Sequence, residues 1–322
     1  MSPLLQAAIL GIVQGATEFL PVSSSAHLIL ARAFFGFDGD KFGLPFDVAC
    51  HVGTLVAVLI YFRDDVMRMV AAIPELFRPG AFGPAKGESQ VRAAHVQTAP
   101  VPPANVPTAD VRRGDLRGTA SDAPSGFIRT EAAQDYARLI WLLVIGTVPA
   151  VVVGLLFNKV IEERMRTPEV AAIALAIGGI LFFVAERVGG HERSDRSLTF
   201  AEAFWIGCAQ ALALVPGVSR SGATITVALL LGLRRPDAAR FIFLLAIPAI
   251  VAAAGKEAPK MLKAGIAGDQ ASLFLIGIVM SAIVGYLAVK FFVQYLQKHT
   301  LDVFGWYRLA LAASVAVWLF IR

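Results

Sequence analysis

The chain has 322 residues, of which 57% are hydrophobic and only 16% charged, and its formal net charge is +5. Soluble domains contain about 45–50% apolar residues, so this composition excludes an ordinary soluble protein. The small positive excess does not indicate a nucleic-acid surface, and in a membrane protein it is typical of cytoplasmic loops. The apolar residues come in blocks, and a membrane span needs about 20 such residues in a helix.

The first two apolar segments are too short to cross a membrane. Residues 4–20 and 24–36 are predicted helices, and Pro21 lies between them. Proline cannot continue a helix, because it lacks a backbone N–H and its ring clashes with the preceding turn. We therefore predict a re-entrant hairpin over residues 4–36, which enters the membrane and returns to the same side. Irregular backbone at that depth is tolerated where protein or a wet cavity covers it.

The rest of the chain alternates long apolar segments with polar ones. Residues 79–134 are rich in Pro, Ala, Gly, Thr and Arg, and we interpret them as a disordered cytoplasmic loop. A second re-entrant hairpin is predicted at residues 199–232. The predicted fold is an all-α integral membrane protein with two re-entrant hairpins and six transmembrane helices, at residues 46–62, 137–157, 168–185, 239–254, 272–289 and 304–321.

The two hairpins share a sequence pattern that aligns without gaps. Each copy is followed by a similar series of apolar segments, which indicates an internal repeat. One hairpin and three spans give an odd number of crossings, so residues 1–198 and 199–322 are predicted to form repeats of opposite orientation. The aligned pairs are Gly11 with Gly207, Gln14 with Gln210, Val22 with Val218, Ser23 with Ser219, and Ser25 with Ser221.

Polar residues of the first hairpin favour a catalytic site. Gln14 and Glu18 are four residues apart and share a helix face. A carboxylate inside an apolar segment is costly, which favours a functional role for Glu18 over a structural one. Ser24 and His27 face the same way at the start of the next helix, where free N–H groups favour anions. His27 is a candidate general base or nucleophile.

The second hairpin offers a cation in the corresponding place. Arg220 follows the break at residues 216–217, and its planar guanidinium can bind phosphate with two hydrogen bonds. Alternatively, the Arg220 side chain extends toward the membrane surface and has no role in binding phosphate. Ser219, Ser221 and Thr224 are candidate donors to phosphate, or they satisfy backbone groups that the broken helix leaves free.

These motifs carry a family resemblance. Gln14-x-x-x-Glu18, Pro21-Val-Ser-Ser-Ser-Ala-His27 and Pro216-Gly-Val-Ser-Arg-Ser-Gly-Ala-Thr224 together resemble the undecaprenyl-diphosphate phosphatases of the bacitracin-resistance family. The resemblance covers nearly the whole chain except residues 79–134, which look like an insertion. It implies hydrolysis of undecaprenyl diphosphate to undecaprenyl phosphate and inorganic phosphate in the bacterial inner membrane. That reaction would recycle the lipid carrier of peptidoglycan synthesis and confer resistance to bacitracin, which competes by binding the same lipid.

The resemblance also implies which residues act. The implied catalytic residues are Glu18, Ser24, His27 and Arg220, with the choice between Ser24 and His27 as nucleophile left open. The implied partners are the polyprenyl diphosphate and the bilayer, with no nucleic acid and with a homodimer left open. The implied phosphate-binding residues are Ser23, Ser25, Ser219, Arg220, Ser221 and Thr224.

A divalent cation, Mg²⁺ or Ca²⁺, is expected at Glu18 and Gln14, because oxygen ligands suit these ions. Family members carry Glu or Gln at the position of Gln14, and the neutral amide here predicts weaker metal binding. Asp47 is a further candidate to support the metal. His51 stands where the family usually has Gln, and it either lines the cavity or is packed.

A transporter or lipid flippase is the competing interpretation, since inverted repeats with broken helices are typical of transporters. The cluster of Ser, His, Glu and Arg around one anion favours an enzyme, although fold alone does not decide function. Loop arginines, among them Arg63, Arg187 and Arg234, predict which side is cytoplasmic, so that the active site opens to the periplasm.

Overall fold

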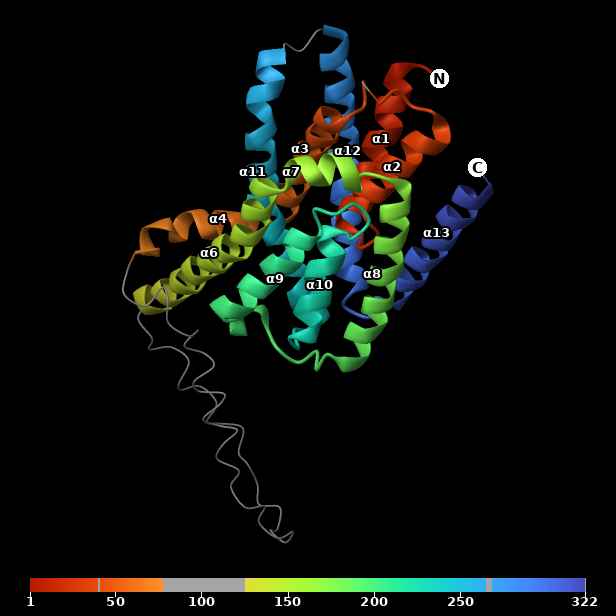
Figure 1. Ribbon diagram of the computed structural model, residues 1–322. Coiled ribbons are helices and arrows are strands. Elements are labelled where there is room, and N and C mark those ends of the chain that lie inside the picture. Colours follow the sequence, from red (N-terminus) through yellow and green to blue (C-terminus); the bar gives the residue numbers. More distant parts are fainter. Residues whose placement is uncertain (40, 78–124, 265–267, 322) are drawn as a thin grey trace, which may run out of the picture. The chain divides into compact units, whose positions relative to one another are not determined.

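The computed structural model describes residues 1–39, 41–77, 125–264 and 268–321 (Figure 1). Within these residues the regular secondary structure is helical, apart from an isolated bridge between Arg193 and Leu233. The chain divides into two compact units, residues 1–66 with 141–322, and residues 67–140. All the site residues discussed below belong to the first unit. Most of the predicted loop, residues 78–124, lies outside the described residues.

Six helices of the described part are long and apolar enough to cross a membrane, which confirms the six predicted spans. Large apolar side chains stay exposed on every one of them, for example Ile60, Ile177 and Leu287. Such exposure is unfavourable in water but natural against lipid, where helices satisfy all their own backbone groups. The six are α3 (Leu44–Tyr61), α6 (Ser125–Leu156), α8 (Pro168–Val188), α11 (Arg235–Ala264), α12 (Gly268–Tyr295) and α13 (Asp302–Ile321).

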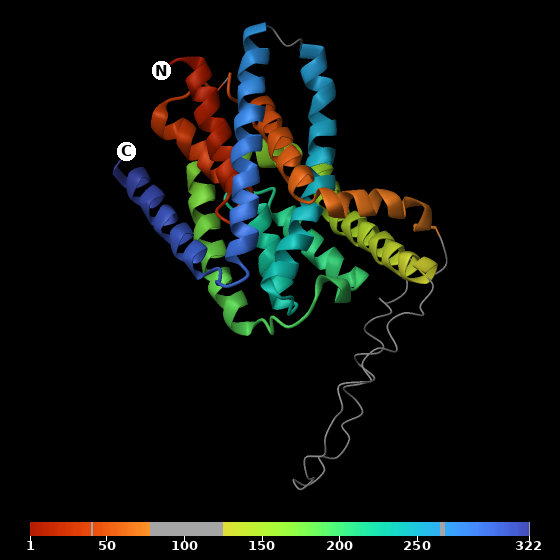
Figure 2. The same cartoon turned by 180° about the vertical axis from the view of Figure 1, so that it is seen from behind.

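Two pairs of shorter helices form hairpins at the predicted places. The first pair is α1 (Pro3–Phe19) with α2 (Ser24–Phe35), and the second is α9 (Phe200–Leu212) with α10 (Arg220–Leu230). Figure 1 and the reverse view in Figure 2 show that they open in opposite directions, with their turns facing each other. That each hairpin enters a membrane without crossing it stays a prediction.

The aligned glycines of the repeat explain how each hairpin packs on a span. A Cβ atom at Gly11 would lie 2.8 Å from the carbonyl oxygen of Gly277 on α12, too close for any side chain. A Cβ at Gly207 would likewise collide with the carbonyl oxygen of Gly146 on α6. Small residues let helix backbones approach closely in membranes, where dispersion contacts replace the hydrophobic effect. The same contact is therefore made twice, and each time the hairpin of one repeat packs against a span of the other.

The structure differs from the sequence prediction on both sides of the polar segment. An additional helix, α4 (Arg63–Ala72), follows α3, and a short 3₁₀ helix, η1 (Ile73–Glu75), follows it. The predicted loop 79–134 is also wrong at its end, because α6 begins at Ser125. Once a span has nucleated a helix, each added residue gains one hydrogen bond, so polar residues can extend it. A prediction that assigns a loop wherever the sequence lacks apolar residues overlooks such helix extensions.

Further short elements connect the long helices. Between α6 and α8 lie α7 (Asn158–Val160) and a π-helical turn, η2 (Ile161–Met165). A short 3₁₀ helix, η3 (Asp195–Ser197), precedes α9. None of these was predicted, since single turns leave no periodic pattern in the sequence.

Candidate active site

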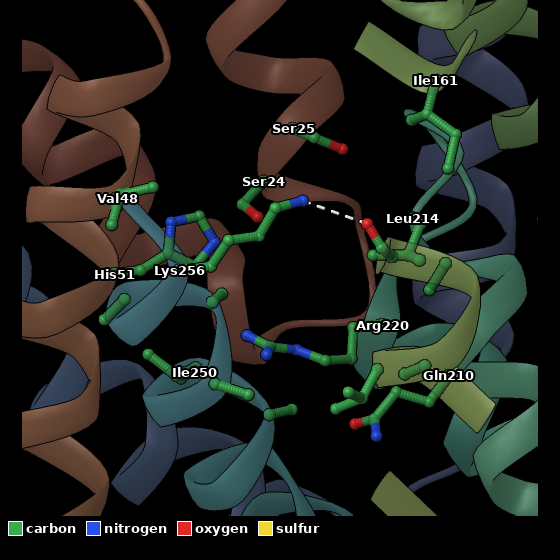
Figure 3. A pocket seen from close by; sticks show the side chains of 18 of the residues that line it. Ser24, Ser25, Val48, His51, Ile161, Gln210, Leu214, Arg220, Ile250 and Lys256 are labelled. Carbon is green, nitrogen blue, oxygen red and sulfur yellow. Dashed lines mark hydrogen bonds between the residues drawn. The ribbon is translucent and has the colours of Figure 1, made fainter. Parts of the chain in front are cut away.

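The two hairpin turns border one cavity of about 320 Å³ (Figure 3). Ser24 and Ser25 enter it from the first hairpin, and Ser219 and Arg220 from the second. The walls contributed by α6 and α11 are largely apolar. This volume falls in the range of small-molecule sites, which are usually apolar with a few polar groups.

Each turn contains a strained serine. Ser23 and Ser219 have φ angles of 74° and 70°, a region that residues other than glycine rarely adopt. Each is the N-cap of the following helix, and its hydroxyl accepts a hydrogen bond from the backbone N–H of Ala26 or Gly222. Strain of this kind persists where the surrounding structure fixes it, often at functional sites. These two turns orient the N-termini of α2 and α10 toward the same cavity, and helix N-termini favour anions.

Glu18 is the centre of the polar contacts. It is buried at the end of α1, and one of its carboxylate oxygens accepts a hydrogen bond from Arg220. The other oxygen accepts hydrogen bonds from the hydroxyl of Ser24 at 2.6 Å and from the amide of Gln14 at 2.8 Å. The Nε2 atom of His51 lies 3.4 Å from that same oxygen. Residues from both hairpins and α3 therefore meet at one carboxylate.

A divalent cation has few protein ligands at this site. The described residues contain no group of three or more His, Cys, Asp and Glu side chains arranged to hold a metal. Mg²⁺ at phosphoryl-transfer sites is often held by one or two carboxylates together with substrate phosphates. Glu18 fits that pattern, and the buried Oε1 atom of Gln14 lacks a hydrogen-bond partner. Asp47 is occupied by ion pairs with Arg32 and Arg166.

Four predicted site residues are not among those that line the cavity: Gln14, which bonds to Glu18, and His27, Ser221 and Thr224. The Nδ1 atom of His27 lies 2.7 Å from the carbonyl oxygen of Ser23, and its Nε2 atom lies 2.7 Å from the hydroxyl of Tyr307. Ser221 donates a hydrogen bond to the carbonyl of Leu20, which links the two hairpins. Thr224 donates to the carbonyl of Arg220 within its own helix. Their proposed roles in catalysis or phosphate binding stay predictions.

Sequence reasoning missed Arg308, which has the largest fully buried side chain, with 0% exposure. Its guanidinium lies 5.2 Å from the ring centre of Phe182 and donates hydrogen bonds to five backbone carbonyls. Its bonds to both hairpin turns fix their relative position. The signal was available, because an arginine inside an apolar span is costly and calls for partners. The carbonyls belong to Pro21, Leu175, Ala174, Gly217 and Val218.

His51 and Lys256 were also left out of the predicted site, and both line the cavity. His51 follows Asp47 by one helical turn on α3, and this spacing could have drawn attention to it. Lys256 gave no such signal. It lies near the end of an apolar segment, where a lysine ordinarily reaches toward the membrane surface.

The profile of the family described as bacitracin resistance protein BacA matches residues 7–107 and 111–314. The chain belongs to this family. It is 44% identical over 316 residues to the undecaprenyl-diphosphatase of Rubrobacter xylanophilus, with 98% of each chain covered. It is 40% identical to undecaprenyl-diphosphatase 2 of Stutzerimonas stutzeri, with 98% of this chain and 97% of the relative covered. The resemblance drawn from the motifs is thereby confirmed.

A third relative, the undecaprenyl-diphosphatase of Trichlorobacter lovleyi, is 38% identical over 313 residues, with 97% of this chain and 96% of the relative covered. The interpretation of residues 79–134 as an insertion stays a prediction.

Proposed function

We propose that this membrane protein hydrolyses undecaprenyl diphosphate to undecaprenyl phosphate and inorganic phosphate. The observation that carries the proposal is the contact of Ser24 and Arg220 with the two oxygens of Glu18, at the meeting point of two helix N-termini. The arrangement provides a hydroxyl nucleophile, its base and a phosphate-binding cation in one cavity. The names of the relatives point to the same reaction.

The proposed nucleophile is the hydroxyl of Ser24. Its hydrogen bond of 2.6 Å to Glu18 allows the carboxylate to take the proton as the oxygen attacks the terminal phosphorus. One bond forms from the Ser24 oxygen to phosphorus, and the bond from phosphorus to the bridging oxygen breaks. Undecaprenyl phosphate then leaves, and water attacks the phosphoserine to release inorganic phosphate and regenerate the hydroxyl. His27 is less suited to attack, because both its ring nitrogens already have partners.

Arg220 and the helix N-termini would offset the charge that develops on the phosphoryl oxygens. Preorganised donors of this kind commonly supply a large part of catalysis. Arg220 pairs with Glu18 in the structure, so it is already held at the reacting centre. We retain the divalent cation as a proposal, with Glu18 and Gln14 as its protein ligands. When bound, it would neutralise phosphate charge.

The experiment is phosphate release from a long-chain prenyl diphosphate by the purified protein in detergent. We expect turnover that an excess of EDTA suppresses. Full activity in EDTA would remove the cation from the proposal, and no phosphate release from a folded sample would overturn the proposed reaction.

We place this activity in the bacterial inner membrane, with the cavity open to the periplasm. There the product would re-enter peptidoglycan synthesis, and bacitracin would compete for the substrate. The loop charges place Lys298 on the predicted cytoplasmic side and Lys256 on the periplasmic side. Thiol labelling of Lys256→Cys and Lys298→Cys variants in intact cells therefore tests the orientation.

A second candidate function is movement of the product lipid across the membrane. Hairpins that open in opposite directions with their turns near one site are typical of alternating-access transporters (Figure 1). Proteoliposomes that contain labelled polyprenyl phosphate would test it. Transbilayer movement no faster than in empty liposomes would exclude it.

A further inference from the structure

We propose that Lys256 is a second phosphate-binding residue, which holds the phosphoryl group that stays attached to the lipid. This inference rests on the proposed function, because it divides the diphosphate between two positions in the cavity. Figure 3 shows the side chains of Lys256 and Arg220 extending into the same cavity from different helices.

The charges already present at the reacting centre balance each other. Arg220 and Glu18 form an ion pair, so together they contribute no net charge toward the substrate. A diphosphate has two anionic phosphoryl groups, and desolvating them requires compensating charge or hydrogen bonds. The second phosphoryl group therefore favours a further positive side chain in the cavity, in addition to Arg220 and the proposed divalent cation.

Lys256 is a cation without an anionic partner in the described part of the chain. Its ammonium donates a hydrogen bond to the carbonyl oxygen of Gly154 at 3.0 Å. Among the described residues, no carboxylate lies within 4.0 Å of that ammonium. Glu257, the other carboxylate that lines the cavity, has interactions of its own. An unpaired charge inside a membrane protein is expensive, which favours a functional role for Lys256.

Several half-buried arginines of the described part differ from Lys256 in this respect, whereas the fully buried Arg308 is held by five backbone carbonyls. Arg32 and Arg166 share the carboxylate of Asp47, and Arg240 bridges Asp65 and Asp195. Their charges are balanced or partly balanced within the protein. Lys256 instead has a neutral carbonyl as its partner, which an incoming phosphate can replace at small cost.

The position of Lys256 in the cavity determines which phosphoryl group it meets. The terminal group must lie at Ser24, so the other group lies on the side from which the prenyl tail leaves. Apolar residues of α6 and α11 line the cavity, and Lys256 connects these two helices through Gly154. Lys256 thus lies where the apolar walls meet the polar end. It is suited to the phosphate that undecaprenyl phosphate retains.

The test uses farnesyl phosphate and inorganic phosphate as separate probes of binding to the purified protein by calorimetry. Lys256→Met should weaken farnesyl phosphate binding by roughly 10- to 100-fold, since hydrogen bonds to charged groups are stronger than those between neutral groups. Binding of inorganic phosphate should stay the same. Lys256→Arg should retain most of the affinity, because this position requires charge and not a particular geometry.

Lys290→Met is the matched control, because Lys290 is exposed on α12 and does not line the cavity. Unchanged farnesyl phosphate binding in Lys256→Met would overturn the inference. So would equal weakening for both probes together with a lower melting temperature, which would indicate a structural role only. Wild-type protein that binds farnesyl phosphate but releases no phosphate from the diphosphate would refute the proposed function, whereas the effect of Lys256→Met on farnesyl phosphate binding decides separately whether Lys256 binds a lipid phosphate.

Discussion

The turn before α2 and the turn before α10 share a strained N-cap serine and an equivalent glycine contact, yet they present different chemistry to the cavity. In the gapless alignment, Ser24 corresponds to Arg220 and Glu18 corresponds to Leu214. All four residues line the cavity. The first hairpin supplies a hydroxyl and a carboxylate, and the second supplies a cation and an apolar surface. Repeats that diverge in this way can form one asymmetric site from two similar halves.

Among the variants that test the difference between the two turns, Ser24→Ala should lose the most activity. This change removes the proposed nucleophile from the first turn, and activity should fall on the order of 10³-fold or more. The measurement is phosphate release in steady state. Ser314→Ala is the control, because Ser314 is an exposed serine that bonds within α13. A variant that keeps a tenth of the wild-type rate would show that another group attacks.

Arg308→Met should break the link between the turns. Five backbone carbonyls would lose a donor, and each buried group left unsatisfied costs about 1–3 kcal/mol. We expect a large fall in melting temperature or failure to purify a folded protein. Arg187→Met is the control, because that side chain is exposed at the end of α8. A melting temperature equal to that of the control would mean that other contacts hold the turns.

Arg220→Lys should lose nearly as much activity as Arg220→Ala, on the order of 10²-fold. Lysine keeps the charge but cannot present two parallel donors to a phosphate. The loss should appear in kcat more than in KM, since the prenyl tail supplies much of the binding. If the lysine variant keeps more than about half of the wild-type rate, Arg220 acts only as a local positive charge.

Gln14→Glu and Gln210→Glu compare the equivalent glutamines of the repeat. The first change places a second carboxylate beside Glu18, so half-maximal activity should occur at lower Mg²⁺. The second lies beside the carbonyl of Gly146, where no shift in the metal titration is expected. An identical titration for wild type and Gln14→Glu would place residue 14 outside the metal site.

The smallest effect is expected when glycine replaces the strained serines. Ser23→Gly and Ser219→Gly each lose a cap hydrogen bond, but glycine adopts the positive φ angle without strain. Replacing an N-cap residue by glycine costs about a few tenths of a kcal/mol of stability. Valine at either position should destabilise much more, since β-branched residues rarely adopt such angles. Equal thermal stability of the glycine and valine variants would show that the turns relax easily.

The sequence alone determined the class of protein and the positions of its long helices. Six apolar segments were predicted and the described residues contain six such helices, because hydrophobic length is a local property. Gln14, Glu18 and Ser24 could be grouped for the same reason, since they are close in the chain. The motifs around Ser24 and Arg220 also gave the family correctly.

Only the tertiary structure decided which of those residues meet. Arg220 reaches Glu18 from the other half of the chain, and His51 and Lys256 come to the cavity from α3 and α11. His27 lies on the expected helix but bonds to Tyr307 of α13, a partner that helix spacing cannot reveal. Helical periodicity fixes the face on which a side chain lies, whereas its partner depends on how distant helices pack. For Arg308, only that packing places the carbonyls of both turns around one buried guanidinium.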